Sequence, residues 1–162
     1  FLAEGGGDPR PEFLSALRSD LGELGDLGEL EQEGTVVAFN ATFERSRLVE
    51  LAAAYPEHAE WIERVGQRFV DLLVPLRSFA YYHPSQLGSA SLKRVLPALG
   101  ARGYQELEIQ AGDLAAREFL RSNLPSTSPA ERAWIRAALL AYCRRDTEGM
   151  VEIVAALERL VR

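Results

Sequence analysis

A short apolar run that passes straight into a helical pattern constrains the fold of this chain more than any other feature. Residues 36–39 (VVAF) predict a short buried strand, which Asn40 ends. Beyond Asn40, one helical face carries Glu44, Leu48, Leu51, Ala52 and Tyr55. Glu44 heads a stripe that is otherwise apolar. Because burying a lone carboxylate is costly, we expect Glu44 to pair with another group or to bind a metal ion.

Helical patterns alternate with strand-like segments early in the chain and dominate its second half. Residues 68–75 predict a further strand, which carries one acid, Asp71, among apolar neighbours. Helices are predicted over residues 11–21, 44–55, 56–65, 92–96, 114–124 and 129–161, and residues 22–34 are predicted to form a loop or a broken helix end. Ser128 is expected to cap the last helix, and Asp113 the one before it. This succession predicts the α/β class.

Length and composition restrict the kind of protein. A chain of 162 residues, 47% hydrophobic and 26% charged, can form one globular domain with a substantial core. The single cysteine, Cys143, excludes a disulfide framework and a cysteine-based zinc cluster, and it suits a reducing compartment. No apolar run reaches the length that crosses a bilayer, and no signal-peptide pattern opens the chain. We therefore expect no membrane partner and a cytoplasmic location.

The first residue and the net charge bear on partners. The chain begins at Phe1 and its only methionine is Met150, so we expect it to be a piece of a longer protein. Its net charge of −6 argues against broad electrostatic attraction to nucleic acid. A metal-dependent nuclease is not excluded, because its carboxylates add negative charge while metal ions meet the phosphate.

A second acid lies on a predicted inward face. The stripe of the last helix comprises Ile135, Leu139, Tyr142, Asp146, Met150, Ile153 and Leu157. Asp146 lies in its middle, and Tyr142 precedes it by one turn, so the Tyr142 hydroxyl can project towards the same cavity. Glu44 and Asp146 therefore share one description, an acid on the core-facing stripe of a helix.

Acids placed in this way suit metal-dependent chemistry. Mg²⁺ and Mn²⁺ prefer carboxylate oxygens, and phosphoryl transfer often uses two such ions to stabilise the attacking and the leaving oxygen. Glu44 and Asp146 are thus candidate metal ligands and catalytic residues, and Tyr142 is a candidate for orienting or activating the attacking water. The alternative is that the two acids pair with Arg47 or Arg145, or lie at the margins of their stripes.

For several other residues, the sequence permits both a functional and a structural interpretation. Asn40 either hydrogen-bonds a substrate or caps the helix, and the cap is favoured. Asp71 is expected to make a structural hydrogen bond. The segment of residues 81–83 (YYH) can stack on a base of a single strand, or it can pack and hydrogen-bond within its loop.

The remaining candidates are mostly assigned structural roles. Ser91 and Lys93 can contact a phosphate at a helix start, although a plain helix cap and a solvated lysine are favoured. Trp61 and Trp134 are predicted to be packing residues. Cys143 is predicted to be a small buried hydrophobe.

Two motifs resemble the DEDD superfamily of 3′–5′ exonucleases, which have the ribonuclease H-like fold. The second motif of that superfamily is a strand, a His-Asn or similar pair, and a Phe-acid pair at the start of a helix. Residues 39–44 (FNATFE) look like it. The third motif of the tyrosine-type branch is Tyr, three residues and Asp, and Tyr142 and Asp146 match that spacing.

Nearly the whole chain resembles a bacterial family of uncharacterised domains related to these exonucleases. Members carry the motifs Asn-Ala-Ser/Thr-Phe-Glu, Tyr-His-Pro, Gly-Ser-x-Ser-(Leu/Ile)-Lys and Tyr-x-x-x-Asp. All four occur in this order here, at residues 40–44, 82–84, 88–93 and 142–146.

The resemblance implies a helix-rich ribonuclease H-like exonuclease fold. It also implies an enzyme that hydrolyses phosphodiester bonds from a 3′ end with Mg²⁺ or Mn²⁺. Glu44 and Asp146 would be metal ligands, and Tyr142 would position the water. The implied partner is a single-stranded end of DNA or RNA. Its contacts would be Asn40, Phe43, His83, Ser91 and Lys93. A second nuclease-type domain in the parent chain is a further candidate partner.

Two departures from the superfamily pattern shape the expectation. Glu44 stands where the usual acid is Asp, and the first motif, Asp-x-Glu on the first strand, is absent. We therefore expect one domain that lacks the first strand of the fold and is inactive alone. The competing hypothesis is a non-catalytic ribonuclease H-like module that binds nucleic acid or protein within a larger chain. An Asp-x-Glu upstream of Phe1 would favour the enzyme.

Overall fold

The computed structural model describes residues 1–21 and 34–161 of the chain. Contacts group the chain into two compact units, Phe1–Leu72 and Leu73–Arg162. Helices dominate the described residues, and their one sheet has two parallel strands, so the predicted helix-rich α/β class is confirmed. The loop or broken helix end predicted over residues 22–34 lies outside the described residues except for Gly34. The assignment of the whole chain to one domain stays a prediction.

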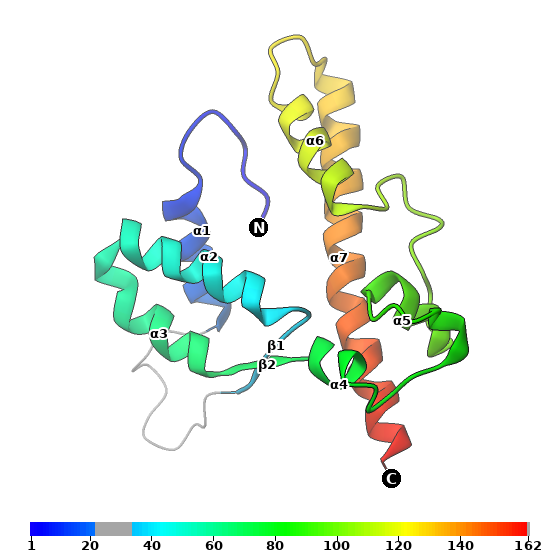
Figure 1. Cartoon of the computed structure of the whole chain (residues 1–162). Helices are drawn as coiled ribbons and strands as arrows, with labels where there is room; N and C mark the ends of the chain where they lie inside the picture. Colours follow the sequence, from blue (N-terminus) through cyan, green and yellow to red (C-terminus); the bar gives the residue numbers. More distant parts are fainter. Residues whose placement is uncertain (22–33, 162) are drawn as a thin grey trace. The chain divides into compact units, whose positions relative to one another are not determined.

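The first unit is organised by a strand–helix–strand connection (Figure 1). Its elements are α1 (Arg10–Leu21), β1 (Val36–Ala38), α2 (Ala41–Ala54), the 3₁₀ helix η1 (Pro56–His58), α3 (Ala59–Gln67) and β2 (Phe69–Asp71). β1 and β2 are parallel, with Val37 opposite Val70. Parallel neighbours need a crossover between them, and α2 with α3 supplies it.

The first turn of α2 is capped from the strand that follows the crossover. Asn40 occupies the N-cap position with a left-handed backbone (φ 74°) and makes no capping hydrogen bond with its side chain. Instead, the backbone N–H groups of Asn40 and Ala41 donate to the two carboxylate oxygens of Asp71, at 2.8 and 3.0 Å. Asn40 is the N-cap residue, as the favoured prediction has it, but its side chain makes no capping bond, because its left-handed backbone departs from the extended conformation of a capping residue. The structural hydrogen bond expected of Asp71 is confirmed.

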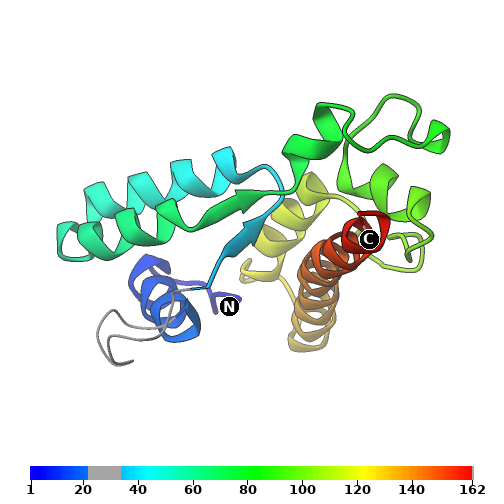
Figure 2. The same cartoon turned by 90° about the horizontal axis from the view of Figure 1, so that it is seen from below.

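The core of the first unit lies between α1 and the two crossover helices. It comprises Leu14, Leu48, Leu51, Trp61, Ile62 and Val65. α2 and α3 lie side by side, as Figure 2 shows, and each contributes one apolar face. Trp61 is 4% exposed, which confirms its predicted packing role.

The second unit is a set of helices around one long helix (Figure 1). Its elements are α4 (Leu73–Arg77), the 3₁₀ helix η2 (Pro84–Gln86), α5 (Leu92–Ala98), α6 (Gly112–Ser122) and α7 (Pro129–Leu160). α6 lies along the N-terminal part of α7 and α5 against its C-terminal part. Ser128 caps α7 as predicted, because its hydroxyl accepts from the Glu131 N–H at 3.2 Å.

A glycine lets α5 approach α7 closely. A Cβ atom placed on Gly149 of α7 would lie 2.8 Å from Cδ1 of Leu96, which is fully buried on α5. That distance is shorter than a van der Waals contact, so a side chain at this position would force the buried Leu96 side chain to move.

Four local predictions are wrong. The strand predicted over residues 68–75 ends at Asp71, because Leu73 and Leu76 bury one face of the short α4, where Pro75 is tolerated in the first turn. Asp113 lies within the first turn of α6, which Ala111 precedes as N-cap. Trp134 is 50% exposed and Cys143 is exposed, because α7 is covered by neighbours along only part of its surface.

No helix in residues 1–21 or 34–161 is both long and apolar enough to cross a membrane.

Candidate functional site

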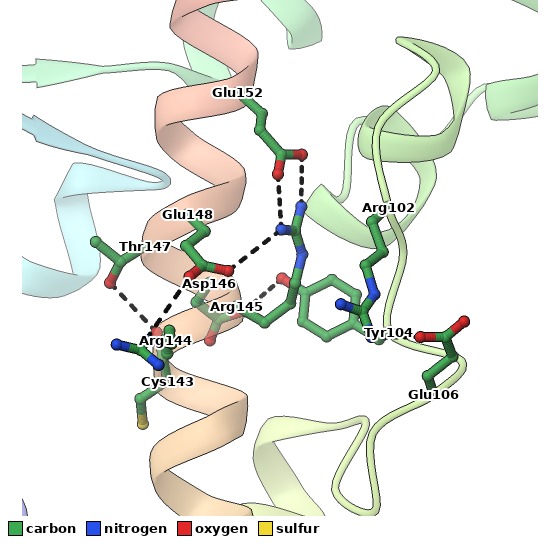
Figure 3. A network of polar contacts seen from close by, with 10 residues as sticks. All are labelled: Arg102, Tyr104, Glu106, Cys143, Arg144, Arg145, Asp146, Thr147, Glu148 and Glu152. Atoms are coloured by element: carbon green, nitrogen blue, oxygen red, sulfur yellow. Dashed lines mark hydrogen bonds and ion pairs between the residues drawn. The ribbon is translucent and has the colours of Figure 1, made fainter.

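Asp146 is held by a tyrosine from outside its own helix. The Tyr104 hydroxyl donates a hydrogen bond to Asp146 Oδ1 at 2.5 Å, as Figure 3 shows. Tyr104 lies in the connection between α5 and α6 and is 4% exposed. Burial, and then its hydrogen bond to Asp146, raise the pKa of Tyr104 above its usual range. The phenol is therefore a fixed donor that sets the orientation of the Asp146 carboxylate.

Tyr142 lies beside the same carboxylate. Its ring centroid is 6.0 Å from that of Tyr104, with the two rings tilted by 46°. Burial, and then the negative charge of Asp146, raise the pKa of Tyr142 to about 12. Tyr142 is therefore a neutral phenol near neutral pH. It can donate a hydrogen bond to a water molecule or a phosphate oxygen, but it is too weak an acid to serve as a phenolate base.

The buried arginine next to Asp146 forms ion pairs with other acids. Arg145 is 5% exposed, and its guanidinium donates to both carboxylate oxygens of Glu152 at 2.8 and 2.7 Å, with Glu148 at 3.6 Å (Figure 3). The hydrogen bond from Arg145 lowers the pKa of Glu152. Among the described residues, Asp146 therefore forms no ion pair with Arg145. Its hydrogen-bond partner is Tyr104.

Glu44 occupies the first turn of α2 as a half-buried acid. Its Oε2 atom is buried without a hydrogen-bond partner among the described residues. Burial, and to a lesser degree the negative charge of Asp71, raise the pKa of Glu44, while a backbone hydrogen bond acts in the opposite direction. Arg47 does not neutralise Glu44, because its ion pair goes to Glu50 at 2.6 Å. An unsatisfied carboxylate oxygen of this kind suits a hard cation.

The other residues predicted in the first unit are exposed. Phe43 is 60% exposed, and the Arg47 guanidinium lies over its ring, 5.6 Å from the centroid. Asn40 is also exposed, with its backbone engaged by Asp71. Both side chains are therefore accessible to a ligand at the start of α2.

The three predicted substrate contacts of the second unit have local roles or lie exposed. The backbone N–H of His83 donates to Gln86 Oε1 at 2.8 Å, and its Nδ1 accepts from the Ser85 N–H at 3.3 Å, so His83 caps η2. Ser91 is the N-cap residue of α5, as favoured, although its side chain makes no capping hydrogen bond. Lys93 is exposed on α5, as expected of a solvated lysine.

Some of the predicted residues have neighbours within their own unit. Tyr142 and Asp146 meet in the second unit, whereas Glu44 lies near Asp71 in the first. Within residues 1–21 and 34–161, no group of three or more His, Cys, Asp or Glu side chains is placed to hold a metal ion. The individual donors still fit a hard cation, because both are carboxylates and Glu44 Oε2 is unsatisfied.

Two members of the Asp146 network were missed. Tyr104 lies in an aperiodic connection, so no pattern could assign it to Asp146. The burial of Arg145 had a weak signal, because Glu148 and Glu152 follow it at about one and two helical turns and can cover it from the same helix.

Comparisons with known proteins give a family without an assigned activity. The family model described as "Domain of unknown function (DUF2779)" matches residues 1–91. The uncharacterised protein MG366 of Mycoplasma genitalium is 28% identical over 138 residues, which cover 78% of this chain and 21% of that protein. Its homologue in Mycoplasma pneumoniae is 27% identical over 129 residues, 72% of this chain and 19% of that protein. The chain thus spans about a fifth of the length of these relatives. No solved structure matches it.

Proposed function

The chain belongs to the DUF2779 family, and we propose that it forms part of a metal-dependent nuclease that removes nucleotides from the 3′ end of a single strand. The observation that carries this proposal is the half-buried carboxylate of Glu44, whose Oε2 has no partner among the described residues. A divalent cation would supply the missing partner and would compensate for the burial of the charge.

Glu44 and Asp146 would hold Mg²⁺ or Mn²⁺ in the parent protein. The ions would supply stabilisation of the attacking and leaving oxygens of a phosphodiester. Tyr104 fixes the Asp146 carboxylate through its 2.5 Å hydrogen bond, so that this ligand is oriented before an ion binds. Tyr142, protonated near neutral pH, would position a water molecule or a phosphate oxygen as a hydrogen-bond donor.

The ribonuclease H-like fold is part of the same proposal, and the edge of β1 supports it. In a parallel strand, every second residue hydrogen-bonds to the same neighbouring strand. In β1, the Val36 N–H and the Ala38 C=O form such bonds with residues at the two ends of β2. The backbone groups of Val37 therefore face the opposite edge. On the far edge of the sheet, the Arg45 side chain donates to Phe69 C=O at 3.3 Å. The strand that carries the first-motif acids would pair with β1 at Val37.

The proposed substrate is single-stranded DNA or RNA. Asn40 and Phe43, which are exposed, would contact it near Glu44, and His83, Ser91 and Lys93 would contact it from the second unit. A second nuclease-type domain of the parent chain and a cytoplasmic location complete the proposal.

A non-catalytic ribonuclease H-like module is the second candidate. It is favoured by the lack, within residues 1–21 and 34–161, of any group of three or more His, Cys, Asp or Glu side chains placed to hold a metal ion. Such a module would bind nucleic acid or a protein without hydrolysing a phosphodiester.

The experiment that separates the two candidates uses the parent protein and a single strand labelled at its 5′ end. We expect ladder-like shortening that requires Mn²⁺ and is abolished by Asp146→Asn, which keeps the shape of the side chain. Glu158→Gln is the control, because Glu158 is an exposed acid of the same helix three turns after Asp146. Degradation that persists in Asp146→Asn would refute the nuclease mechanism.

A further inference from the structure

One stretch of the second unit is the longest run of the chain without an acidic residue. Residues 73–105 contain no Asp or Glu, and they carry Arg77, Lys93, Arg94 and Arg102, while the whole chain has a net charge of −6. The stretch includes α4, η2 and α5. Its net positive charge suits this stretch to meet a polyanion, although the protein as a whole is acidic.

Three of these cations have no acidic partner. Arg77, Lys93 and Arg94 are exposed and form no ion pair within the described residues. In the same unit, Arg102 pairs with Glu106 and Arg117 with Asp113. The positive charge of Arg77, Lys93 and Arg94 is thus left for solvent or for a ligand.

Two aromatic rings stand exposed between these cations in the chain. Phe79 is 65% exposed and Tyr82 is 43% exposed, and their centroids lie 5.5 Å apart in an edge-to-face arrangement. The Tyr82 hydroxyl accepts from the Gly88 N–H at 3.3 Å, which holds this ring in place. The apolar faces of these two rings are in contact with water. This contact is unfavourable unless another molecule covers the rings.

The backbone that presents these side chains is strained. Phe79 and Leu87 have φ angles of 59° and 52°, in the left-handed region that bulky residues avoid. Leu87 is 75% exposed, so burial does not account for either residue at its position. Both residues end a helix in this conformation, Leu87 after η2 and Phe79 after α4, where glycine is the usual choice.

The surroundings keep the exposed rings fixed beside α5. The N–H groups of Ala80 and Tyr81 both donate to the C=O of Pro75, and the Tyr81 hydroxyl donates to the C=O of Ala98 at 3.5 Å. Gln86 is 1% exposed and holds η2 by accepting from the His83 N–H. The rings, Arg77 of α4 and the cations of α5 therefore belong to one ordered block.

We infer that Arg77, Phe79, Tyr82, Lys93 and Arg94 form a binding surface for single-stranded nucleic acid, called here the Phe79 surface. Bases stack on Phe79 and Tyr82, and phosphates meet the three cations, which is how proteins bind single strands without sequence preference. The inference rests on the proposed function only for the class of ligand. It requires neither a metal ion nor hydrolysis.

The test measures binding of fluorescent oligonucleotides of about 12 nucleotides, one of deoxythymidine and one of uridine, to the 162-residue chain in EDTA. Phe79→Gly should weaken binding about tenfold, because base–aromatic stacking is lost. The same change should keep or raise the melting temperature, because glycine adopts a φ of 59° without strain. Trp134→Ala is the control, since it removes an exposed ring of the same unit outside the Phe79 surface.

The cations are tested by the salt dependence of binding. The triple variant Arg77→Gln, Lys93→Gln and Arg94→Gln should reduce the slope of log affinity against log salt by about 2, as expected for three phosphate contacts on a single strand. Arg117→Gln, which removes an exposed arginine already paired with Asp113, should leave the slope unchanged.

Either oligonucleotide alone, bound with these variant effects, supports the inference. Absence of binding to both at about 50 mM salt would overturn it and would indicate a protein partner for the exposed rings. Binding that Phe79→Gly leaves unchanged would overturn it as well. Because EDTA removes metal ions, a failure of the nuclease proposal leaves this result unaffected.

Discussion

The hydrogen bond between Tyr104 and Asp146 can be removed with almost no change of shape. Tyr104→Phe deletes one oxygen and keeps the ring that packs beside Tyr142. A hydrogen bond to a charged group contributes about 1.5–3 kcal/mol to stability. The 2.5 Å bond from the buried Tyr104 belongs in this class, so the variant should lose about 1.5–3 kcal/mol of unfolding free energy at neutral pH. For a chain of this size the melting temperature would fall by about 3–12 °C.

The assay is a double-mutant cycle followed by thermal and urea unfolding. Tyr104→Phe, Asp146→Asn and the double variant are compared with the unchanged chain. If the two groups stabilise the fold through their mutual bond, the double variant should be more stable than the sum of the single losses predicts, by about 1–3 kcal/mol. Losses that add to within about 0.5 kcal/mol would refute the assigned coupling.

Alkaline pH supplies an independent check of the same bond. The folded chain raises the pKa of Tyr104 above the value of about 10 found in unfolded chains. A raised pKa means that the protonated phenol is favoured in the folded state, so its contribution is complete below about pH 10 and is lost as the pH rises further. Tyr142, whose pKa is raised to about 12, acts in the same direction. Stability should therefore fall above about pH 10, and less steeply in Tyr104→Phe.

Two further substitutions test the acid of α2 and the contact between α5 and α7. Glu44→Gln should raise the melting temperature at neutral pH and change it little in acid, because burial raises the Glu44 pKa and the ionised form therefore opposes folding. Glu63→Gln, on the exposed face of α3, is the control. A lower melting temperature for Glu44→Gln would contradict the argument. Gly149→Ala should lower the unfolding free energy by about 1–2 kcal/mol in urea titrations, because the free-energy cost of the clash with Leu96 exceeds the gain in helix propensity. A stabilised variant would show that α5 can shift without penalty.

The sequence was most informative where structure is local. The apolar run of residues 36–39 followed by Asn40 placed β1 and the start of α2, and the Ser128 signature placed the start of α7. These features depend on neighbours within a few residues, so their patterns survive in any context. The placement of Tyr142 beside Asp146 is likewise a consequence of helical spacing.

The failures share a dependence on contacts between distant residues. The cap of α2 comes from Asp71, 31 residues after Asn40, and no local pattern reports it. The exposure of Trp134 follows from which faces of α7 are covered by α5 and α6, whereas periodicity shows only that a face could be buried. Tyr104 reaches Asp146 across 42 residues from a segment without any period. The metal site and the relation to the exonucleases stay predictions.

The capping of α2 by Asp71 links a helix to the strand pairing that completes the sheet. The amides of Asn40 and Ala41 are held by a residue whose own position depends on β2 lying next to β1. They can therefore exchange with solvent hydrogen only when the strand moves away, and not by fraying of the helix alone. The first turn of α2, which carries Glu44, is thus secured in the native state by a residue 31 positions downstream.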